Sequence, residues 1–314
     1  MNSTGTSLGD RVGSGVMGLC FALGIPGNIM TVVFILRHFK KDNFSLHLML
    51  NLAASDILCL MTLPVWIYYL LNGWIFGPVF CKVLFTQGTV AMNTSVFTVT
   101  LMSVQRYVTV LHRDRWAQLR RRGERVLLLS TWVLACVLSI PSALTADARA
   151  VESKLKCRRW SASDEQRLAI LCFEFLLGFV VPFSILVTCY CRLHRKVNRG
   201  VFFRNPRLTK LITRIMLVFF IFSFPVYLLF PVEIVALALK SSHPHVSEKI
   251  MDFQEASANV AISLIFINSC VNPFLYAFAS RKLFAGAKKP NSSGNSSQVD
   301  RVCVAQSAPQ SLCD

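Results

Sequence analysis

The run Leu211–Leu239, LITRIMLVFFIFSFPVYLLFPVEIVALAL, decides the fold, because it is long and its only charged side chains are Arg214 and Glu233. A helix needs about 20 mostly apolar residues to cross a membrane, where unpaired backbone groups find no partners. The chain holds six further runs of this kind, at 14–37, 46–71, 79–111, 126–146, 167–191 and 251–279. The sequence therefore predicts an all-α membrane protein, a bundle of seven helices over 14–279.

The composition excludes most soluble classes. Of 314 residues, 54% are apolar and only 16% are charged, whereas a soluble domain carries roughly a quarter charged residues. The net charge of +17 would suit nucleic-acid binding, but the charge is one-sided. The segments after the first, third, fifth and seventh spans hold 22 of the 33 Lys and Arg residues and only five of the 16 Asp and Glu residues. The positive-inside rule makes these segments cytosolic, so the charge indicates an orientation and no nucleic-acid partner.

This orientation divides the chain. Residues 1–13 are expected to be an extracellular amino terminus, and residues 290–314 a disordered cytoplasmic tail. Serines in that tail are candidate phosphorylation sites for arrestin recruitment. The sequon Asn2-Ser3-Thr4 lies outside, which makes Asn2 a candidate glycosylation site. The sequence thus predicts a multi-pass plasma-membrane protein with its amino terminus outside.

Two of the eleven cysteines face an oxidising compartment. Cys81 lies at the outer end of the third span, and Cys157 lies in the loop after the fourth. Seven others fall within or at the ends of spans, where a thiol behaves as a small hydrophobe. Cys81 and Cys157 can therefore pair, and the bridge would pin the second outer loop across the mouth of the bundle.

A carboxyl group, Asp56, lies inside the second span. A charge at this depth is costly unless it is paired or wet, so Asp56 is a functional candidate. The alternative is a protonated carboxyl group that hydrogen-bonds between helices. A carboxylate with several neutral oxygens suits a hard cation such as sodium. Polar side chains near the middle or inner half of other spans are Asn28, Ser95, Asn268, Ser269 and Asn272.

Each span carries a landmark, and the landmarks occur in order. They are Gly27-Asn28, Leu52-Ala53-Ala54-Ser55-Asp56, Cys81 with Gln105-Arg106-Tyr107, Trp132, Pro182 with Tyr190, Pro225, and Asn272-Pro273-Phe274-Leu275-Tyr276. Over residues 14–290 this set resembles the class A (rhodopsin-like) G-protein-coupled receptors. The resemblance implies a short amphipathic eighth helix on the membrane surface over 280–289.

The resemblance also implies roles for single residues. An allosteric sodium ion, the one cofactor expected, would be held by Asp56, Ser95, Asn268, Ser269 and Asn272. An activation switch would comprise Arg106, Tyr190, Pro225 and Tyr276, and the outer disulfide would join Cys81 to Cys157. On agonist binding the sixth span would move outward about Pro225, and Arg106 would be released toward a G protein. Taken alone, Arg106 is equally well a snorkelling interfacial arginine.

Two positions depart from the family pattern. Gln105 stands where the family usually has Asp, and Phe222-Ser223-Phe224-Pro225 stands where it usually has Cys-Trp-x-Pro. A neutral amide holds an arginine less strongly than a carboxylate does. We therefore expect a loosely restrained inactive state.

Local motifs narrow the ligand class. Thr62-Leu63-Pro64 and Trp74-Ile75-Phe76-Gly77 resemble chemokine and other chemoattractant receptors, whereas residues 173–183 resemble the leukotriene B4 receptors. The short amino terminus offers little grip for a large ligand. The favoured agonist is a small lipid mediator such as leukotriene B4, and the expected partner is an inhibitory-type G protein. The alternatives are a peptide or chemokine receptor and a non-signalling decoy.

The mouth of the bundle is expected to be an apolar ligand pocket with a few polar anchors. Its candidate residues are Trp66, Tyr69, Phe85, Thr89, Asn93, Glu174, Tyr227 and Glu233. The aromatic members are equally explained as an interfacial belt. Bases of the second outer loop, among them Arg158 and Arg159, either neutralise a ligand carboxylate or form a solvated loop.

The sequence lacks the features that other classes of membrane protein require. A retinal protein needs a Schiff-base lysine in the last span, and 251–279 contains none. A transporter would show paired inverted halves, and no internal repeat is seen. The six histidines lie near or beyond span ends, so no enzyme activity is expected.

Overall fold

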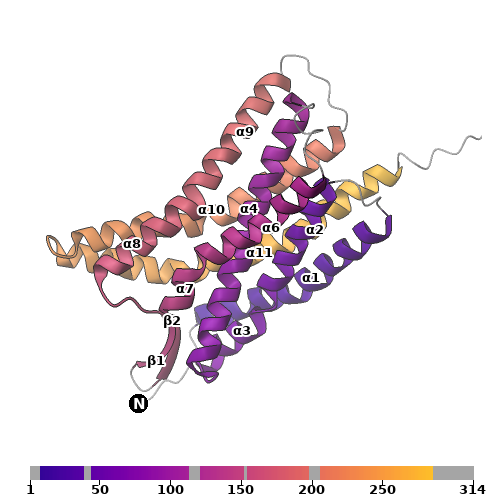
Figure 1. Ribbon diagram of the computed structural model, residues 1–314. Coiled ribbons are helices and arrows are strands. Elements are labelled where there is room, and N and C mark those ends of the chain that lie inside the picture. Colours follow the sequence, from indigo (N-terminus) through magenta and orange to yellow (C-terminus); the bar gives the residue numbers. More distant parts are fainter. Residues whose placement is uncertain (1–7, 39–43, 113–120, 152–153, 198–205, 286–314) are drawn as a thin grey trace, which may run out of the picture.

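The computed structural model describes residues 8–38, 44–112, 121–151, 154–197 and 206–285, which form a helical bundle with one small hairpin (Figure 1). In chain order the elements are α1 (Leu8–His38), α2 (Phe44–Leu60), α3 (Leu63–Asn72), α4 (Gly77–Leu111), α6 (Arg121–Leu138), α7 (Ile140–Thr145), β1 (Ala146–Val151), β2 (Lys154–Arg159), α8 (Asp164–Phe175), η1 (Leu176–Val180), α9 (Val181–Val197), α10 (Pro206–Leu239) and α11 (Pro244–Ala285). The candidate glycosylation site Asn2 and the predicted tail lie outside the described residues.

Each of the seven predicted spans is one helix or a run of two or three consecutive helices. Within the described chain, six stretches are long and apolar enough to cross a membrane: Gly9–Arg37, Phe44–Asn72, Gly123–Thr145, Asp164–Leu193, Leu211–Leu239 and Pro244–Tyr276. The remaining span, α4, is a 35-residue helix with polar residues such as Thr94, Ser95 and Thr98 on its buried side. It contacts α2, α6, α9 and α10. Its polar groups therefore face protein instead of lipid.

Two spans are interrupted or change helix type next to a proline. Between α2 and α3, the Thr62 hydroxyl donates to the carbonyl of Cys59 at 2.7 Å, and Pro64 lies in the first turn of α3. The fifth span passes through a π-helical turn, η1, just before Pro182. Proline has no N–H to continue the helical ladder, which explains these positions. Pro225, by contrast, lies inside an uninterrupted α10.

A β-hairpin, which was not among the predicted elements, follows α7. Strands β1 and β2 pair antiparallel, with Asp147 opposite Arg158 and Ala148 opposite Cys157. The backbone N–H of Trp160 donates to the carbonyl of Thr145 at 2.8 Å, which closes the base of the hairpin. The hairpin lies at the same end of the bundle as α3 and α7 (Figure 1).

Helices α2, α4 and α6 are joined through one amide. The Asn51 side chain on α2 donates to the hydroxyl of Thr98 on α4 at 2.7 Å. It also accepts from the indole N–H of Trp132 on α6 at 2.8 Å. Three helices therefore share directional bonds in the middle of the bundle.

The first helix packs closely against α2 and α11 at Gly24. A Cβ atom at this position would lie 2.6 Å from Leu60 Cδ1 and 2.7 Å from Cys270 Sγ. Glycine is therefore required for the observed approach of α1 to its neighbours.

The predicted eighth helix is described only in part. Residues 280–285 continue α11 without a break, and 286–289 lie outside the described residues. A separate helix at 280–289 stays a prediction.

Candidate functional site

A cavity of about 500 Å³ lies between the end of the hairpin, the start of α8 and the outer part of α10. Three arginines line it, Arg158, Arg159 and Arg167, together with Asp164 and Glu233. Its apolar lining includes Trp160, Ile170 and Leu171. The Arg158 guanidinium lies over the Trp160 ring, 4.3 Å from its centroid. The cavity is therefore a basic, partly apolar hollow.

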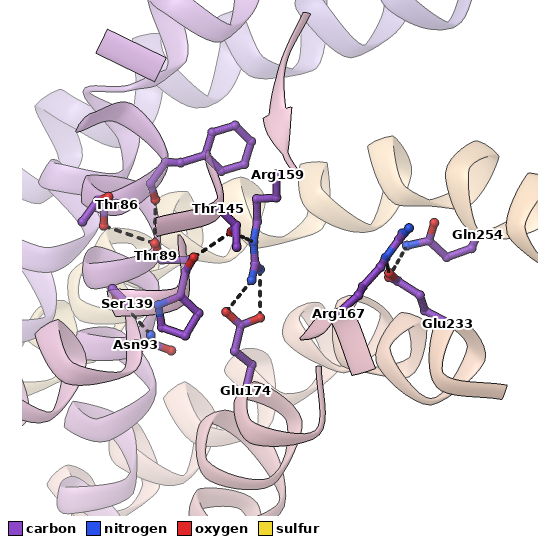
Figure 2. A network of polar contacts seen from close by, with 12 residues as sticks. Thr86, Thr89, Asn93, Ser139, Thr145, Arg159, Arg167, Glu174, Glu233 and Gln254 are labelled. Atoms are coloured by element: carbon purple, nitrogen blue, oxygen red, sulfur yellow. Dashed lines mark hydrogen bonds and ion pairs between the residues drawn. The ribbon is translucent and has the colours of Figure 1, made fainter. Parts of the chain in front are cut away.

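Two of these arginines are held by acids. Arg159 of β2 donates to both carboxylate oxygens of Glu174 on α8, at 2.8 and 2.9 Å. Arg167 on α8 donates to Glu233 on α10 at 2.5 Å, and Gln254 on α11 donates to the same carboxylate at 3.1 Å. Figure 2 shows Arg159 reaching from the hairpin to Glu174. The contacts of Glu233 with Arg167 and Gln254 lie beside this pair. The sequence predicted both acids as ligand anchors and did not indicate these partners.

Of the eight predicted pocket residues, Glu233 alone lines this cavity, and Glu174 is connected to it through Arg159. The other six lie elsewhere, in two groups. Trp66, Tyr69 and Phe85 surround Trp74 in an aromatic cluster beside the hairpin. The Trp66 and Phe85 rings meet edge to face, with centroids 5.1 Å apart. The protein itself therefore supplies the packing partners of these three rings.

The second group lies deeper. Thr89 donates to the carbonyl of Phe85 at 2.6 Å, and Asn93 donates to the hydroxyl of Ser139 at 3.4 Å. Tyr227 is buried and stacks on Phe179, with centroids 4.6 Å apart. The structure therefore does not gather all eight predicted residues around one cavity.

The predicted disulfide is present. Cys81 at the outer end of α4 is bonded to Cys157 on β2, and both are buried. The bond ties the hairpin to the central helix and so places Arg158 and Arg159, the next two residues, at the cavity.

Three of the predicted sodium residues, Ser95, Ser269 and Asn272, meet around Asp56, which is fully buried. Its carboxylate accepts from the Asn272 side chain at 2.8 Å, and the hydroxyls of Ser95 and Ser269 lie next to it. Asn268 is buried on the same stretch of α11 as Ser269. Within the described chain, one oxygen each of Asp56, Asn268 and Asn272 has no hydrogen-bond partner. Buried oxygens in this condition fit a hard cation, which takes oxygen ligands.

Three of the four predicted switch residues lie toward the opposite end of α4, and the fourth, Pro225, lies well inside α10. Arg106 and Tyr190 line one small cavity with Met216, between α4, α9 and α10. Tyr276 packs against the neighbouring apolar cluster. Ser45, on the first turn of α2, accepts hydrogen bonds from both Gln105 and Arg106, each at 2.9 Å. Sequence reasoning missed Ser45, because a serine at a helix start carries no signal of a partner 60 residues away.

Comparison with known proteins agrees with this arrangement. Residues 27–276 match the profile of the family described as 7 transmembrane receptor (rhodopsin family). The chain belongs to this family.

Three similar proteins illustrate the relationship. The chain is 30% identical over 273 residues to C-C chemokine receptor type 7 of Homo sapiens. The aligned region covers 84% of this chain and 70% of that receptor. It is 30% identical over 268 residues to C-C chemokine receptor type 8 of Macaca mulatta, with 84% and 74% covered. It is 31% identical over 289 residues to the type-2 angiotensin II receptor of Meriones unguiculatus, with 84% and 75% covered.

This chain is thus a multi-pass membrane receptor for extracellular ligands, in a family of receptors and not of enzymes. One of the two departures from the family pattern, Ser223, lies on α10. Ser223 is buried, and nearby rings on α10 carry the contact with the fifth span. Phe220 stacks on Phe183 at a centroid distance of 4.7 Å, next to the Phe179–Tyr227 stack.

Proposed function

We propose that this receptor responds to a small anionic lipid chemoattractant of the leukotriene B4 type and activates inhibitory-type G proteins. The supporting observation is the 500 Å³ cavity beside the hairpin. Pockets for small ligands span roughly 300–1,000 Å³. The size of the cavity therefore suits a small agonist. The proposal includes a plasma-membrane location with the amino terminus outside and arrestin binding to the tail.

The charges around the cavity favour a carboxylate ligand. Arg159 and Arg167 are already paired with acids. Arg158 is exposed, contacts the Trp160 ring, and has no acidic partner in the part of the chain that is described. Its guanidinium is free to donate two parallel hydrogen bonds to a carboxylate. Ile170 and Leu171 supply an apolar wall for the hydrocarbon part of such a ligand.

Removing this guanidinium tests the proposal. Arg158→Ala is expected to lower the affinity for a carboxylate agonist by about tenfold or more, because a hydrogen bond to a charged group is worth about 1.5–3 kcal/mol. Competition binding on membranes measures it. Arg149→Ala is the matched control, since Arg149 also lies over Trp160 but does not line the cavity. An equal loss in both variants, or equal sensitivity of the agonist's methyl ester, would contradict a carboxylate contact at Arg158.

A peptide or chemokine agonist is the second candidate, because two of the relatives compared above are C-C chemokine receptors. A non-signalling decoy is the third, because Gln105 and Ser223 alter positions that serve activation in the family. A screen of leukotrienes, hydroxy fatty acids, formyl peptides and chemokines on transfected cells separates the three. A response to chemokines alone selects the second candidate. Binding without activation of any Gα subunit selects the decoy.

We also propose that Asp56, Ser95, Asn268, Ser269 and Asn272 bind an allosteric sodium ion. If sodium binds only the inactive state, raising its concentration lowers agonist affinity, by about fivefold for a coupling of about 1 kcal/mol. Asp56→Asn removes the charge that attracts the ion and is expected to abolish this dependence. Agonist binding in sodium chloride and in choline chloride of equal ionic strength separates the specific effect from screening. The same sodium dependence in both proteins would rule out this pocket.

A further inference from the structure

The inner end of α4 is linked to α2 through a single hydroxyl group. Ser45 Oγ lies 2.9 Å from Gln105 Nε2 and 2.9 Å from Arg106 Nη2. All three side chains are buried, with exposed fractions of 2%, 5% and 8% respectively. The contact therefore lies in a water-poor setting, where a hydrogen bond to a charged group is strong.

The serine, and not the neighbouring glutamine, restrains the arginine. A hydroxyl oxygen has two lone pairs, and here one accepts from the Gln105 amide and the other from the Arg106 guanidinium. The Gln105 side-chain oxygen, the atom that stands in place of a carboxylate, has no hydrogen-bond partner within the described residues. Gln105 therefore orients Ser45 and does not itself bind Arg106.

The inner part of α10 has no acidic residue that could restrain Arg106. Between Pro206 and Glu233 the sequence of α10 contains no Asp or Glu, and its inner part carries Arg207, Lys210 and Arg214. None of these three side chains can accept a hydrogen bond from the Arg106 guanidinium. The described contact of α10 with the inner part of α4 is instead a hydrogen bond from the Ser103 hydroxyl to Met216 Sδ, at 3.3 Å.

We propose that Ser45 is a positioning residue for the activation switch, which holds Arg106 in the inactive receptor in place of the carboxylate that the chain lacks. Arg106 borders the cavity between α4, α9 and α10, the space that the arginine enters when it leaves Ser45. Because the restraint comes from α2, movement of α10 alone does not break it. The strength of this one contact sets the ligand-free activity of the receptor.

A pair of isosteric substitutions isolates the hydroxyl group. Ser45→Thr keeps the oxygen, and Ser45→Val has the same shape without it, so any packing change is common to both. We expect Ser45→Val to raise agonist-free nucleotide exchange about tenfold or more above Ser45→Thr, the factor that corresponds to a hydrogen bond to a charged group of about 1.5 kcal/mol or more. Exchange is measured on membranes with a panel of Gα subunits and normalised to receptor surface density.

Two further variants complete the experiment. Ser142→Ala removes another buried hydroxyl, one without a partner in the described structure, and is expected to leave exchange unchanged. Adding Gln105→Asp to Ser45→Val supplies the missing carboxylate and is expected to return exchange to the level of Ser45→Thr. Exchange that is equal in the Thr and Val variants at equal surface density, whether high or absent, overturns the proposal. So does a similar rise in Ser142→Ala.

Discussion

Reversing the charge of Arg159 alone is expected to destabilise the receptor by about 3 kcal/mol or more, whereas reversing Arg159 and Glu174 together restores most of the loss. The two side chains form a bidentate pair at 2.8 and 2.9 Å, and only 12% of the Glu174 side chain is exposed. Arg159→Glu places two carboxylates face to face in this partly buried position. Breaking a buried pair costs about 3–5 kcal/mol, because the remaining charge stays desolvated.

The double substitution Arg159→Glu/Glu174→Arg also separates structure from ligand binding. Melting of the detergent-solubilised receptor measures the coupling between the two positions. If the pair only holds the hairpin on α8, the swapped receptor regains both stability and agonist affinity. If Arg159 also contacts a ligand carboxylate, it regains stability alone.

A matched pair on the hairpin provides the control. Arg149 and Asp147 are 3.2 Å apart, but 57% and 32% of their side chains are exposed. Exposed pairs contribute about 0–1 kcal/mol. Single reversals there are expected to leave the melting temperature nearly unchanged. A comparable loss at both pairs would mean that net charge of the hairpin, and not the buried contact, determines stability.

Replacing both Cys81 and Cys157 by serine is expected to cost about 4 kcal/mol in the chain-entropy description of a loop of this length, since the two cysteines are 76 residues apart. Loss of the disulfide is expected to lower agonist affinity more than substitution of any single cavity residue does. Without the bond, the hairpin loses its tie to α4, and Arg158 and Arg159 lose their common position. Agonist affinity and the melting temperature should fall together.

A reductant offers an independent test. It is expected to reproduce the loss of binding in the natural protein and to have no effect on the Cys81→Ser/Cys157→Ser variant. Cys136→Ser is the control, because Cys136 is an exposed free cysteine. Full agonist binding by the double serine variant would show that the hairpin keeps its place through other contacts.

Much of the fold could be predicted from the sequence, because each span is a continuous local signal. The runs around Pro225 and Pro273 are apolar over lengths that only a membrane requires. The polar surroundings of Asp56 could also be predicted, since a carboxyl group inside a span needs polar partners. That the site binds sodium stays a prediction. The disulfide followed from topology, which leaves Cys81 and Cys157 on the oxidising side.

The ion pairs and the hairpin could not be predicted in the same way. Glu174 and Glu233 were visible as acids in apolar runs, but their partners come from other elements, 15 and 66 residues away in the chain. Sequence reasoning about one element carries no information about such distant pairing. The hairpin did leave a signal, because residues 146–150 (ADARA) and 154–158 (KLKCR) alternate apolar and polar side chains, but each run is only five residues long and most of the apolar members are alanine.

The amide of Asn51 has a mechanical consequence. Hydrogen bonds are directional and tolerate little sliding. Helices α2, α4 and α6, which are bonded through Asn51, Thr98 and Trp132, therefore form a rigid unit. Helices α9 and α10 meet instead through stacked rings, among them Phe183 and Phe220. Parallel rings slide over one another without breaking a directional bond. The receptor is thus built as a fixed half and a sliding half. The cavity beside the hairpin is lined by β2, which the disulfide ties to α4 of the fixed half, and by α10 of the sliding half.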